Sequence, residues 1–236
     1  MRGDETPFAG DEMKMVGLLF SIAFALAQLP LPFGPSQQEK PEEIEKPSPV
    51  KGWWMVSYFG VPPTRYERVG QRIIKAESVG SRSTLFREVS LKEKGLPVLS
   101  WRWKISNVVR SAIETRKDRY DAAARVIVVF GKEKSYWMFE GLAPRGLRIE
   151  YIWASRLPVG KVFNHPSEKF TKIFVLESGE GKSNQWVAEQ RDLHKDYTAA
   201  FGTGTPEVVA LGLETDTDHS NEMVTAYYAE PVLKKR

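Results

Sequence analysis

The sequence predicts an all-β domain, a jelly-roll-like β-sandwich of the galactose-binding-like or concanavalin-like kind with one short helix near the C-terminal third. Segments with the two-residue periodicity of strands follow one another from residue 53 to residue 229. Turn residues separate these segments every 8–12 positions or so, as in sandwiches. Long helices between consecutive strands, which a parallel α/β sheet needs, are missing from the pattern.

The segment Trp101-Arg102-Trp103-Lys104 organises the domain. Successive side chains of a strand point to opposite faces, so the two tryptophans share one face and the two cations share the other. The indoles could pack against a second sheet or form the floor of a groove that stacks flat ligands. Because Ser100 also makes the cationic face polar, we expect the indoles in the core and Arg102 and Lys104 at a ligand.

The other elements follow in chain order. Strands are expected at 53–59, 72–79, 83–89, 120–130, 136–139, 147–153, 170–178, 185–190, 207–214 and 223–229. Gly80-Ser81 predicts a hairpin between the second and third of these strands. Residues 106–119 predict a loop with a helical turn. The helix is expected at 192–201, with Asp192 as its N-cap and Gly202 at its C-terminal end.

The chain begins with features of an exported protein. Met15 to Leu26 is an apolar run as long as a signal-peptide core and shorter than the roughly 20 residues that cross a bilayer. Small residues around Leu26 predict cleavage before Gln28, and Met13 is the better translation start. The alternative is an uncleaved segment that anchors the chain in the membrane. Residues 1–27 are therefore expected to be a signal peptide, 28–50 a Pro/Glu/Lys-rich linker and 51–236 the β-sandwich.

Composition excludes several classes of site. The 236 residues contain no Cys and three His, which excludes disulfides, thiolate metal sites and a Cys nucleophile. We expect export to the periplasm, the cell surface or the medium, with stability supplied by the core alone. The formal net charge of +4 allows weak attraction to acidic polymers. No basic run occurs, so nucleic-acid binding is not expected. The sequence leaves the oligomeric state open.

Several segments together resemble a bacterial family catalogued as a domain of unknown function, DUF3047. They are LSWRWKI (99–105), YDAAARVIVVF (120–130), EYIWA (150–154), QWVAEQRDLHKDYTAAFG (185–202) and LETDTDHSNEMVTAYYAE (213–230). The departures are mild; for example, the family pattern often has Asn at the position of His219. The resemblance implies an exported jelly-roll-like sandwich and no particular activity.

Two groups of residues could bind a ligand or a metal. Asp121 and Arg125 lie four apart on one strand face, where they could reach each other or a shared ligand, and Glu189 and Arg191 lie near the helix. Arginines in such positions suit an anionic or polyhydroxyl ligand, whereas buried ion pairs are the structural alternative. Asp216 and Asp218 in a strand-end loop could bind Ca²⁺, or could cap the backbone of a turn.

Three functions remain open. The preferred one is a non-catalytic module that binds a saccharide or an envelope polymer through an exposed aromatic platform. The second is a hydrolase of a glycan or ester whose carboxylates converge in one cleft; the candidates are Asp121, Glu140, Glu150, Glu189, Asp216 and Asp218. The third is a structural subunit of an envelope assembly, which would present a large exposed apolar patch.

Overall fold

The described part of the chain is a sandwich of two β-sheets. The computed structural model describes residues 48–89, 95–131, 146–204 and 206–235, all within one compact unit, Glu43–Arg236. The predicted signal peptide, most of the linker and the predicted strand at 136–139 lie outside the described residues. No helix of the described residues has the length and apolarity that a membrane crossing requires.

The larger sheet has seven strands. In spatial order they are β1 (Trp54–Ser57), β4 (Arg82–Glu88), β11 (Glu207–Asp216), β6 (Ala122–Gly131), β7 (Leu147–Ala154), β9 (Thr171–Ser178) and β8 (Val162–Asn164). All neighbours are antiparallel except β7 and β9, which are parallel.

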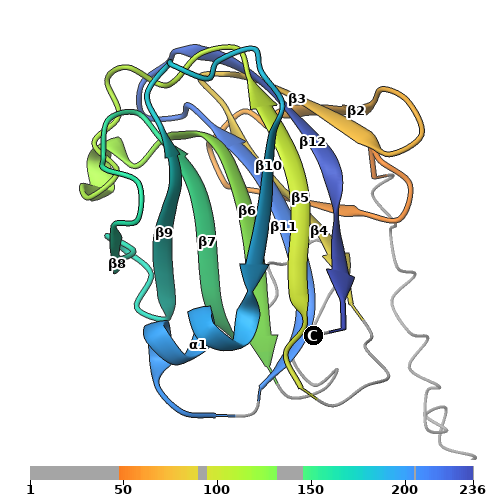
Figure 1. The fold of residues 1–236 in the computed structure, drawn as a ribbon. Helices are drawn as coiled ribbons and strands as arrows, with labels where there is room; N and C mark the ends of the chain where they lie inside the picture. The colour runs from red at the N-terminus through yellow and green to blue at the C-terminus, as the bar shows by residue number, and fades with distance from the viewer. Residues whose placement is uncertain (1–47, 90–94, 132–145, 205, 236) are drawn as a thin grey trace, which may run out of the picture. The chain divides into compact units, whose positions relative to one another are not determined.

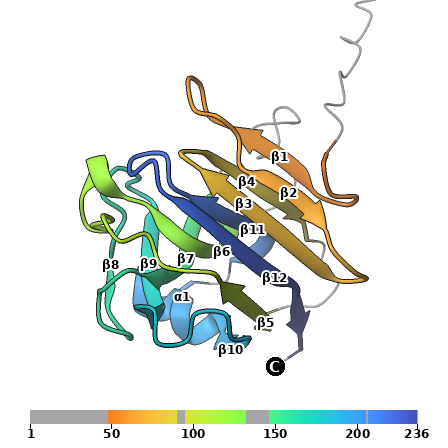
Figure 2. The same cartoon turned by 90° about the horizontal axis from the view of Figure 1, so that it is seen from above.

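The smaller sheet has five antiparallel strands. In spatial order they are β10 (Val187–Asp192), β5 (Val98–Ile105), β12 (Met223–Lys234), β3 (Ile73–Val79) and β2 (Arg65–Arg68). Figures 1 and 2 show the two sheets lying face to face. The predicted jelly-roll-like β-sandwich is therefore confirmed.

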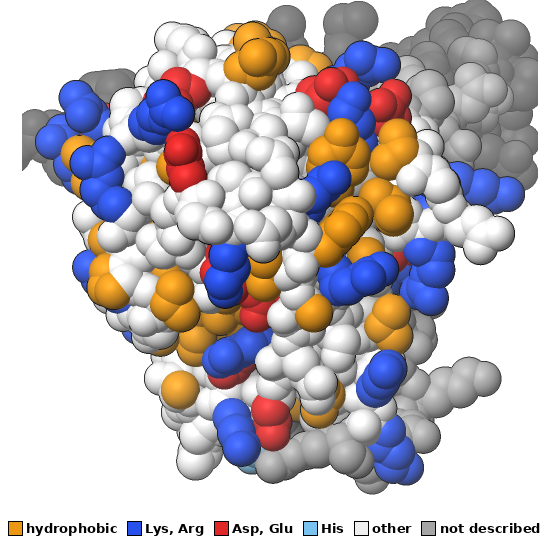
Figure 3. All heavy atoms as spheres, turned by 45° about the horizontal axis from the view of Figure 1, so that its top comes forward, with side chains coloured by type: hydrophobic (Ala, Val, Ile, Leu, Met, Phe, Trp, Pro, Cys, Tyr) orange, Lys and Arg blue, Asp and Glu red, His pale blue; other side chains and the backbone are white. Residues whose placement is uncertain are grey.

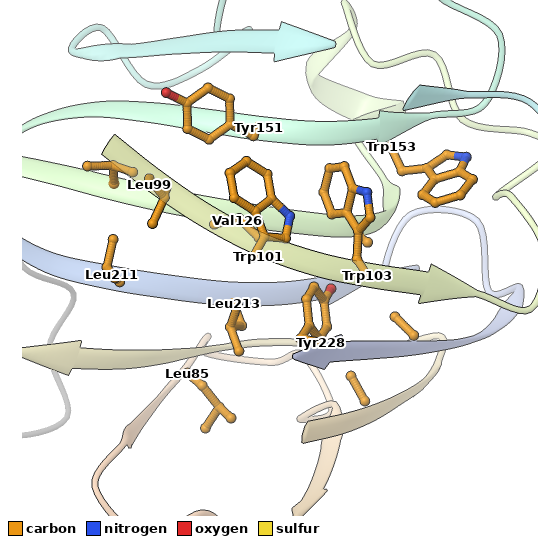
Figure 4. Close-up of a cluster of buried hydrophobic side chains, with 14 of the residues drawn as sticks. Leu85, Leu99, Trp101, Trp103, Val126, Tyr151, Trp153, Leu211, Leu213 and Tyr228 are labelled. Atoms are coloured by element: carbon orange, nitrogen blue, oxygen red, sulfur yellow. The ribbon is translucent and has the colours of Figure 1, made fainter. Parts of the chain in front are cut away.

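The core lies between the sheets and contains the indoles of β5. Trp101 is 4% exposed and Trp103 is fully buried, which confirms their predicted place in the core. Figure 4 shows them beside aromatic side chains of β7 in the opposite sheet. The ring of Trp101 lies 5.4 Å from that of Tyr151, and the ring of Trp103 lies 5.8 Å from that of Trp153. These four rings tie the two sheets together.

The predicted hairpin at Gly80-Ser81 is wrong, because β3 and β4 belong to different sheets. The two residues form a corner that carries the chain across the sandwich. Three buried hydroxyls stabilise the corner: Ser78 Oγ lies 2.7 Å from Thr217 Oγ1 and 3.0 Å from Ser81 Oγ. Gly80 has a φ of 52°, and a Cβ there would lie 2.7 Å from Asn221 Oδ1. The corner therefore needs glycine for its conformation and for space.

The single α-helix of the described residues has the predicted place and caps. α1 (Leu193–Phe201) lies across one end of the sandwich in Figure 1. Asp192 accepts hydrogen bonds from the backbone N–H groups of His194 and Lys195, and Gly202 follows the helix with a φ of 85°. The predicted helical turn corresponds to the 3₁₀ helix η1 (Lys117–Arg119). The short strands β2 and β8 were not expected, and β12 runs five residues further than expected, to Lys234.

Candidate functional site

The outer face of the five-stranded sheet carries two cations between two aromatic rings. Lys104 on β5 pairs with Tyr227 on β12, and Trp186 precedes β10 on the other side of β5. Lys104 Nζ lies 4.3 Å from the Tyr227 ring and 5.6 Å from the Trp186 ring. The guanidinium of Arg102 lies 5.5 Å from the same indole. We call Arg102, Lys104, Trp186 and Tyr227 the Trp186 face.

Exposure separates Trp186 from the other tryptophans. Its side chain is 38% exposed, and Trp54 is half-buried. The remaining described tryptophans are buried at 4% exposure or less; they are Trp53, Trp101, Trp103 and Trp153. Trp137 lies outside the described residues. Among the described tryptophans, only Trp186 is exposed enough for the predicted aromatic platform, and the half-buried Tyr227 lies beside it.

A surface hollow of about 600 Å³ adjoins the Trp186 face at Arg102. Arg72 and Lys234 also line it, and both are exposed. Figure 3 shows blue Lys and Arg side chains beside orange hydrophobic ones on this side of the molecule. Glu230 lines the hollow too, but its carboxylate is engaged by arginines: Arg68 lies 2.6 Å from it. Arg72 and Arg87 lie 4.0 and 3.8 Å away. Cations therefore outnumber free carboxylates around the hollow.

The predicted ligand residues Glu189 and Arg191 take different places on β10. Glu189 also lines the hollow. Burial raises the pKa of its carboxyl to about 7, helped by the negative charge of Glu177. Arg191 instead forms an ion pair with Asp196 of α1, with nitrogen and oxygen 2.5 Å apart. The hydroxyl of Tyr151 donates to the same carboxylate at 2.6 Å. Arg191 therefore joins strand to helix, as the structural alternative expects.

A buried charged cluster lies on the outer side of the seven-stranded sheet. Arg125 on β6 is fully buried and contacts Glu214 and Asp216 of β11, the latter at 2.7 Å. Arg82 on β4 lies 3.3 and 3.5 Å from the same two carboxylates. Arg125 also donates to the backbone oxygen of Tyr120 at 2.8 Å. We call Arg82, Arg125, Glu214 and Asp216 the Arg125 cluster.

The carboxyl groups around Arg125 differ in their pKa. Burial raises the pKa of Glu214, but the charges of Arg82 and Arg125 outweigh burial and lower it to about 2. Burial raises the pKa of Asp216 well above its usual range, against the same two arginines. Glu150, whose carboxylate accepts from the Tyr120 hydroxyl at 2.6 Å, also has a pKa raised by burial. This divergence is typical of acid–base pairs, although all three side chains are buried at 3% exposure or less.

A second polar cluster lies where β6 begins. Asp121 and Arg125 form no ion pair among the described residues. Instead, Asp121 Oδ1 lies 3.1 Å from His219 Nδ1, and its other oxygen accepts the N–H of Ser220 at 2.8 Å. Asp218 Oδ1 lies 2.6 Å from the same His219 nitrogen. Of the two predicted metal ligands, Asp218 therefore lies with Asp121 and His219, whereas Asp216 lies in the Arg125 cluster.

Apart from Glu189 at the hollow and Arg191 in its ion pair with Asp196, the described site residues predicted from the sequence fall into three places, and each includes residues that the sequence did not single out. Arg102 and Lys104 meet Trp186 and Tyr227; Arg125 and Asp216 meet Arg82 and Glu214; Asp121 and Asp218 meet His219. Glu140 lies outside the described residues. The added partners come from strands or loops distant in sequence. Two local signals existed: Glu214 lies two residues before Asp216 on the same face of its strand, and His219 directly follows Asp218.

Comparison with known proteins identifies the family of this chain. The family model described as "Protein of unknown function (DUF3047)" matches residues 51–232. No curated protein matches the sequence. Among solved structures, a family 12 xyloglucanase from Bacillus licheniformis in complex with ligand is similar, with 9% identity, a TM-score of 0.42, and coverage of 79% of this chain and 88% of that one. The xyloglucanase domain of NopAA from Sinorhizobium fredii, in complex with cellobiose, has 11% identity and a TM-score of 0.43, with 79% and 94% covered. At these identities the likeness concerns the fold alone.

Proposed function

The chain belongs to the DUF3047 family of proteins of unknown function, so we propose a function from its own residues. It is an exported, non-catalytic module that binds an acidic saccharide or envelope polymer on the Trp186 face. The N-terminal apolar run and the absence of cysteine support export.

The observation that carries the proposal is the exposure of Trp186 beside two cations. When a flat ring of a ligand stacks on the exposed indole, apolar surface of both is removed from water, which favours binding. Tyr227 provides a second ring whose centroid lies 6.4 Å from that of Trp186. Lys104 lies between the two rings, and Arg102 lies beside Trp186. These cations can pair with a carboxylate or sulfate group of a ligand whose ring lies on the indole.

The adjoining hollow extends the same chemistry. Arg72, Arg102 and Lys234 present three cations around it, and the carboxylate of Glu230 is already paired with arginines. A polymer that carries repeated negative charges could contact the indole and the hollow together. A neutral polymer would gain only the stacking. We therefore expect an acidic polymer to bind more tightly than a neutral one.

The experiment is calorimetric titration of the protein with polygalacturonate as the acidic probe and xyloglucan as the neutral one. The informative variants are Trp186→Ala and the double variant Arg102→Ala/Lys104→Ala. The matched control is Lys117→Ala/Arg119→Ala, which removes two exposed cations of η1. We expect at least tenfold weaker binding of the acidic probe by both informative variants, and unchanged binding by the control.

Salt separates the two contributions. Because exposed charges are screened, affinity for the acidic probe should fall between 50 and 300 mM NaCl, and the fall should be smaller in the double variant. If Arg102→Ala/Lys104→Ala binds as tightly as the control variant, or if Trp186→Ala retains full affinity, the Trp186 face is not the binding site.

A second function, hydrolysis of a glycan or ester, is favoured by one observation. Glu150 lies on β7, and Glu214 and Asp216 lie on β11; both strands border β6. The pKa values of these carboxyl groups are displaced in opposite directions. A hydrolase would lose its activity in Glu150→Gln or Asp216→Asn. The burial of all three groups favours a structural cluster, and release of reducing sugar from either probe would reverse this preference.

A further inference from the structure

The Asp121, Asp218 and His219 side chains bring three metal-binding atoms together, and we propose that they bind a divalent transition-metal ion of the Zn²⁺ type. The ligand atoms are one carboxylate oxygen from each aspartate and Nδ1 of the histidine. All three lie within 4.8 Å of one another. Asp121 directly precedes β6, whereas Asp218 and His219 belong to the turn after β11. The proposed site therefore joins two elements about 100 residues apart in the chain.

Among the described residues, no Lys or Arg compensates the negative charge of this site. The side chain of Asp121 is 1% exposed, and among the described residues neither Asp121 nor Asp218 forms an ion pair with Lys or Arg. A buried carboxylate is normally paired with a cation or bound to a metal, because its desolvation is costly. The contrast with Asp216 is direct: that carboxylate lies within 4 Å of two arginines.

The hydrogen bonds of the site are also incomplete. His219 Nδ1 lies 3.1 Å from Asp121 Oδ1 and 2.6 Å from Asp218 Oδ1, yet a ring nitrogen carries at most one hydrogen. Asp218 Oδ1 is shielded from solvent and has no hydrogen-bond partner among the described residues. A metal ion would use the lone pairs of all three atoms at once. The histidine would then keep its hydrogen on Nε2.

A comparable set elsewhere does not fit a metal, which makes the assignment selective. Glu150, His165 and Glu168 also lie close together. In that set His165 Nδ1 accepts two backbone N–H groups, from Ser167 at 3.1 Å and Glu168 at 2.9 Å. The hydrogen of the neutral ring must then be on Nε2, so neither nitrogen has a lone pair for a metal. Arg125 also lies 3.9 Å from the Glu150 carboxylate.

The ligand types decide the class of ion. One imidazole nitrogen with two carboxylate oxygens suits Zn²⁺ or a neighbouring transition metal, whereas Ca²⁺ takes six to eight oxygens. Zn²⁺ bonds of about 2.0–2.2 Å to tetrahedral ligands put those ligands roughly 3.3–3.6 Å apart. The side chains would need to open by less than about 1 Å. Ca²⁺, one of the two alternatives that the sequence left open at Asp216 and Asp218, fits this set less well.

The experiment uses tag-free protein dialysed against EDTA and then titrated separately with ZnCl₂, MnCl₂ and CaCl₂, followed by calorimetry and thermal unfolding. We expect one Zn²⁺ per chain. Because a ligand that binds only the folded state stabilises it, Tm should rise by about 5–10 °C at 100 times the Kd.

The variants Asp218→Asn and His219→Ala should bind Zn²⁺ at least tenfold more weakly. Because His219 Nδ1 contacts both carboxylates, the Zn²⁺-dependent rise in Tm is measured for each variant relative to its own metal-free Tm. The controls His194→Ala and Asp118→Asn replace exposed residues of the same types in α1 and η1, and they should bind like the original chain. The proposal is overturned if Zn²⁺ causes neither heat nor a Tm rise, if His219→Ala binds like His194→Ala, or if Ca²⁺ raises Tm as much as Zn²⁺.

Discussion

Replacing Arg125 with Met tests how much the Arg125 cluster contributes to folding. Met has a similar volume and no charge, so the variant leaves Glu214 and Asp216 buried with one arginine instead of two. Removing one partner from a buried ion pair costs about 3–5 kcal/mol. Because Arg82 remains within 3.5 Å of both carboxylates, the low end applies.

A second loss comes from the backbone. Arg125 donates to the carbonyl oxygen of Tyr120, and leaving a buried acceptor without its donor costs about 1 kcal/mol more. The expected loss is therefore about 4 kcal/mol in the free energy of unfolding. At about 2–4 °C per kcal/mol for a domain of this size, Tm should fall by about 8–16 °C.

The assay is urea unfolding followed by tryptophan fluorescence, with Arg110→Met as the control. Arg110 is 76% exposed, and its replacement should change stability by less than about 0.5 kcal/mol. Adding Glu214→Gln to Arg125→Met removes a buried negative charge that has lost one of its arginine partners, and should recover part of the lost free energy of unfolding. A loss below about 1 kcal/mol in Arg125→Met, or no recovery in the double variant, would refute the reasoning.

Two further predictions concern β10 and α1. The pKa of Glu189 is about 7 in the folded state and 4.5 in an ordinary setting, so the unfolded chain loses its proton first and stability falls as pH rises between these values. Between pH 5 and pH 8, the free energy of unfolding of the original chain should therefore fall by about 1 kcal/mol relative to that of Glu189→Gln, a value reduced to allow for the partial exposure of the side chain. Urea unfolding that gives the same pH profile for both proteins would contradict this. Asp192→Ala removes the acceptor for two backbone N–H groups of α1 and should lower the free energy of unfolding by about 1 kcal/mol. The control His194→Ala should change it little. If thermal unfolding does not distinguish the two variants, Asp192 does not stabilise the helix as its N-cap.

Local patterns predicted the elements well. The alternation around Trp101 and Trp103 identified the strand and the face that enters the core, because periodicity reports directly on burial. Asp192 and Gly202 identified the ends of α1, because caps are local in sequence. Both signals need only neighbouring residues.

Pairing between distant strands was not predictable in the same way. Gly80-Ser81 has the composition of a hairpin turn, but the hydroxyl contacts that make it a corner come from Thr217, more than 130 residues away. Arg125 was matched to Asp121 because they are four apart on one strand. Its partners Glu214 and Asp216 became neighbours only through the register of β6 with β11. The same holds for Trp186 and Tyr227, which two strand pairings bring to Lys104.

The order of strands has a consequence for when the chain can fold. β11 lies between β4 and β6 in one sheet, and β12 lies between β3 and β5 in the other. In each sheet, the strand that joins the early and later strands is therefore one of the last two strands of the described residues. Without residues 207–234, the larger sheet is divided into β1–β4 and β6–β7–β9–β8, and the smaller sheet into β10–β5 and β3–β2, each with an open edge. Completion of both sheets therefore depends on pairing between strands far apart in the sequence, which predicts slower folding than in a chain of the same size with mostly local pairing.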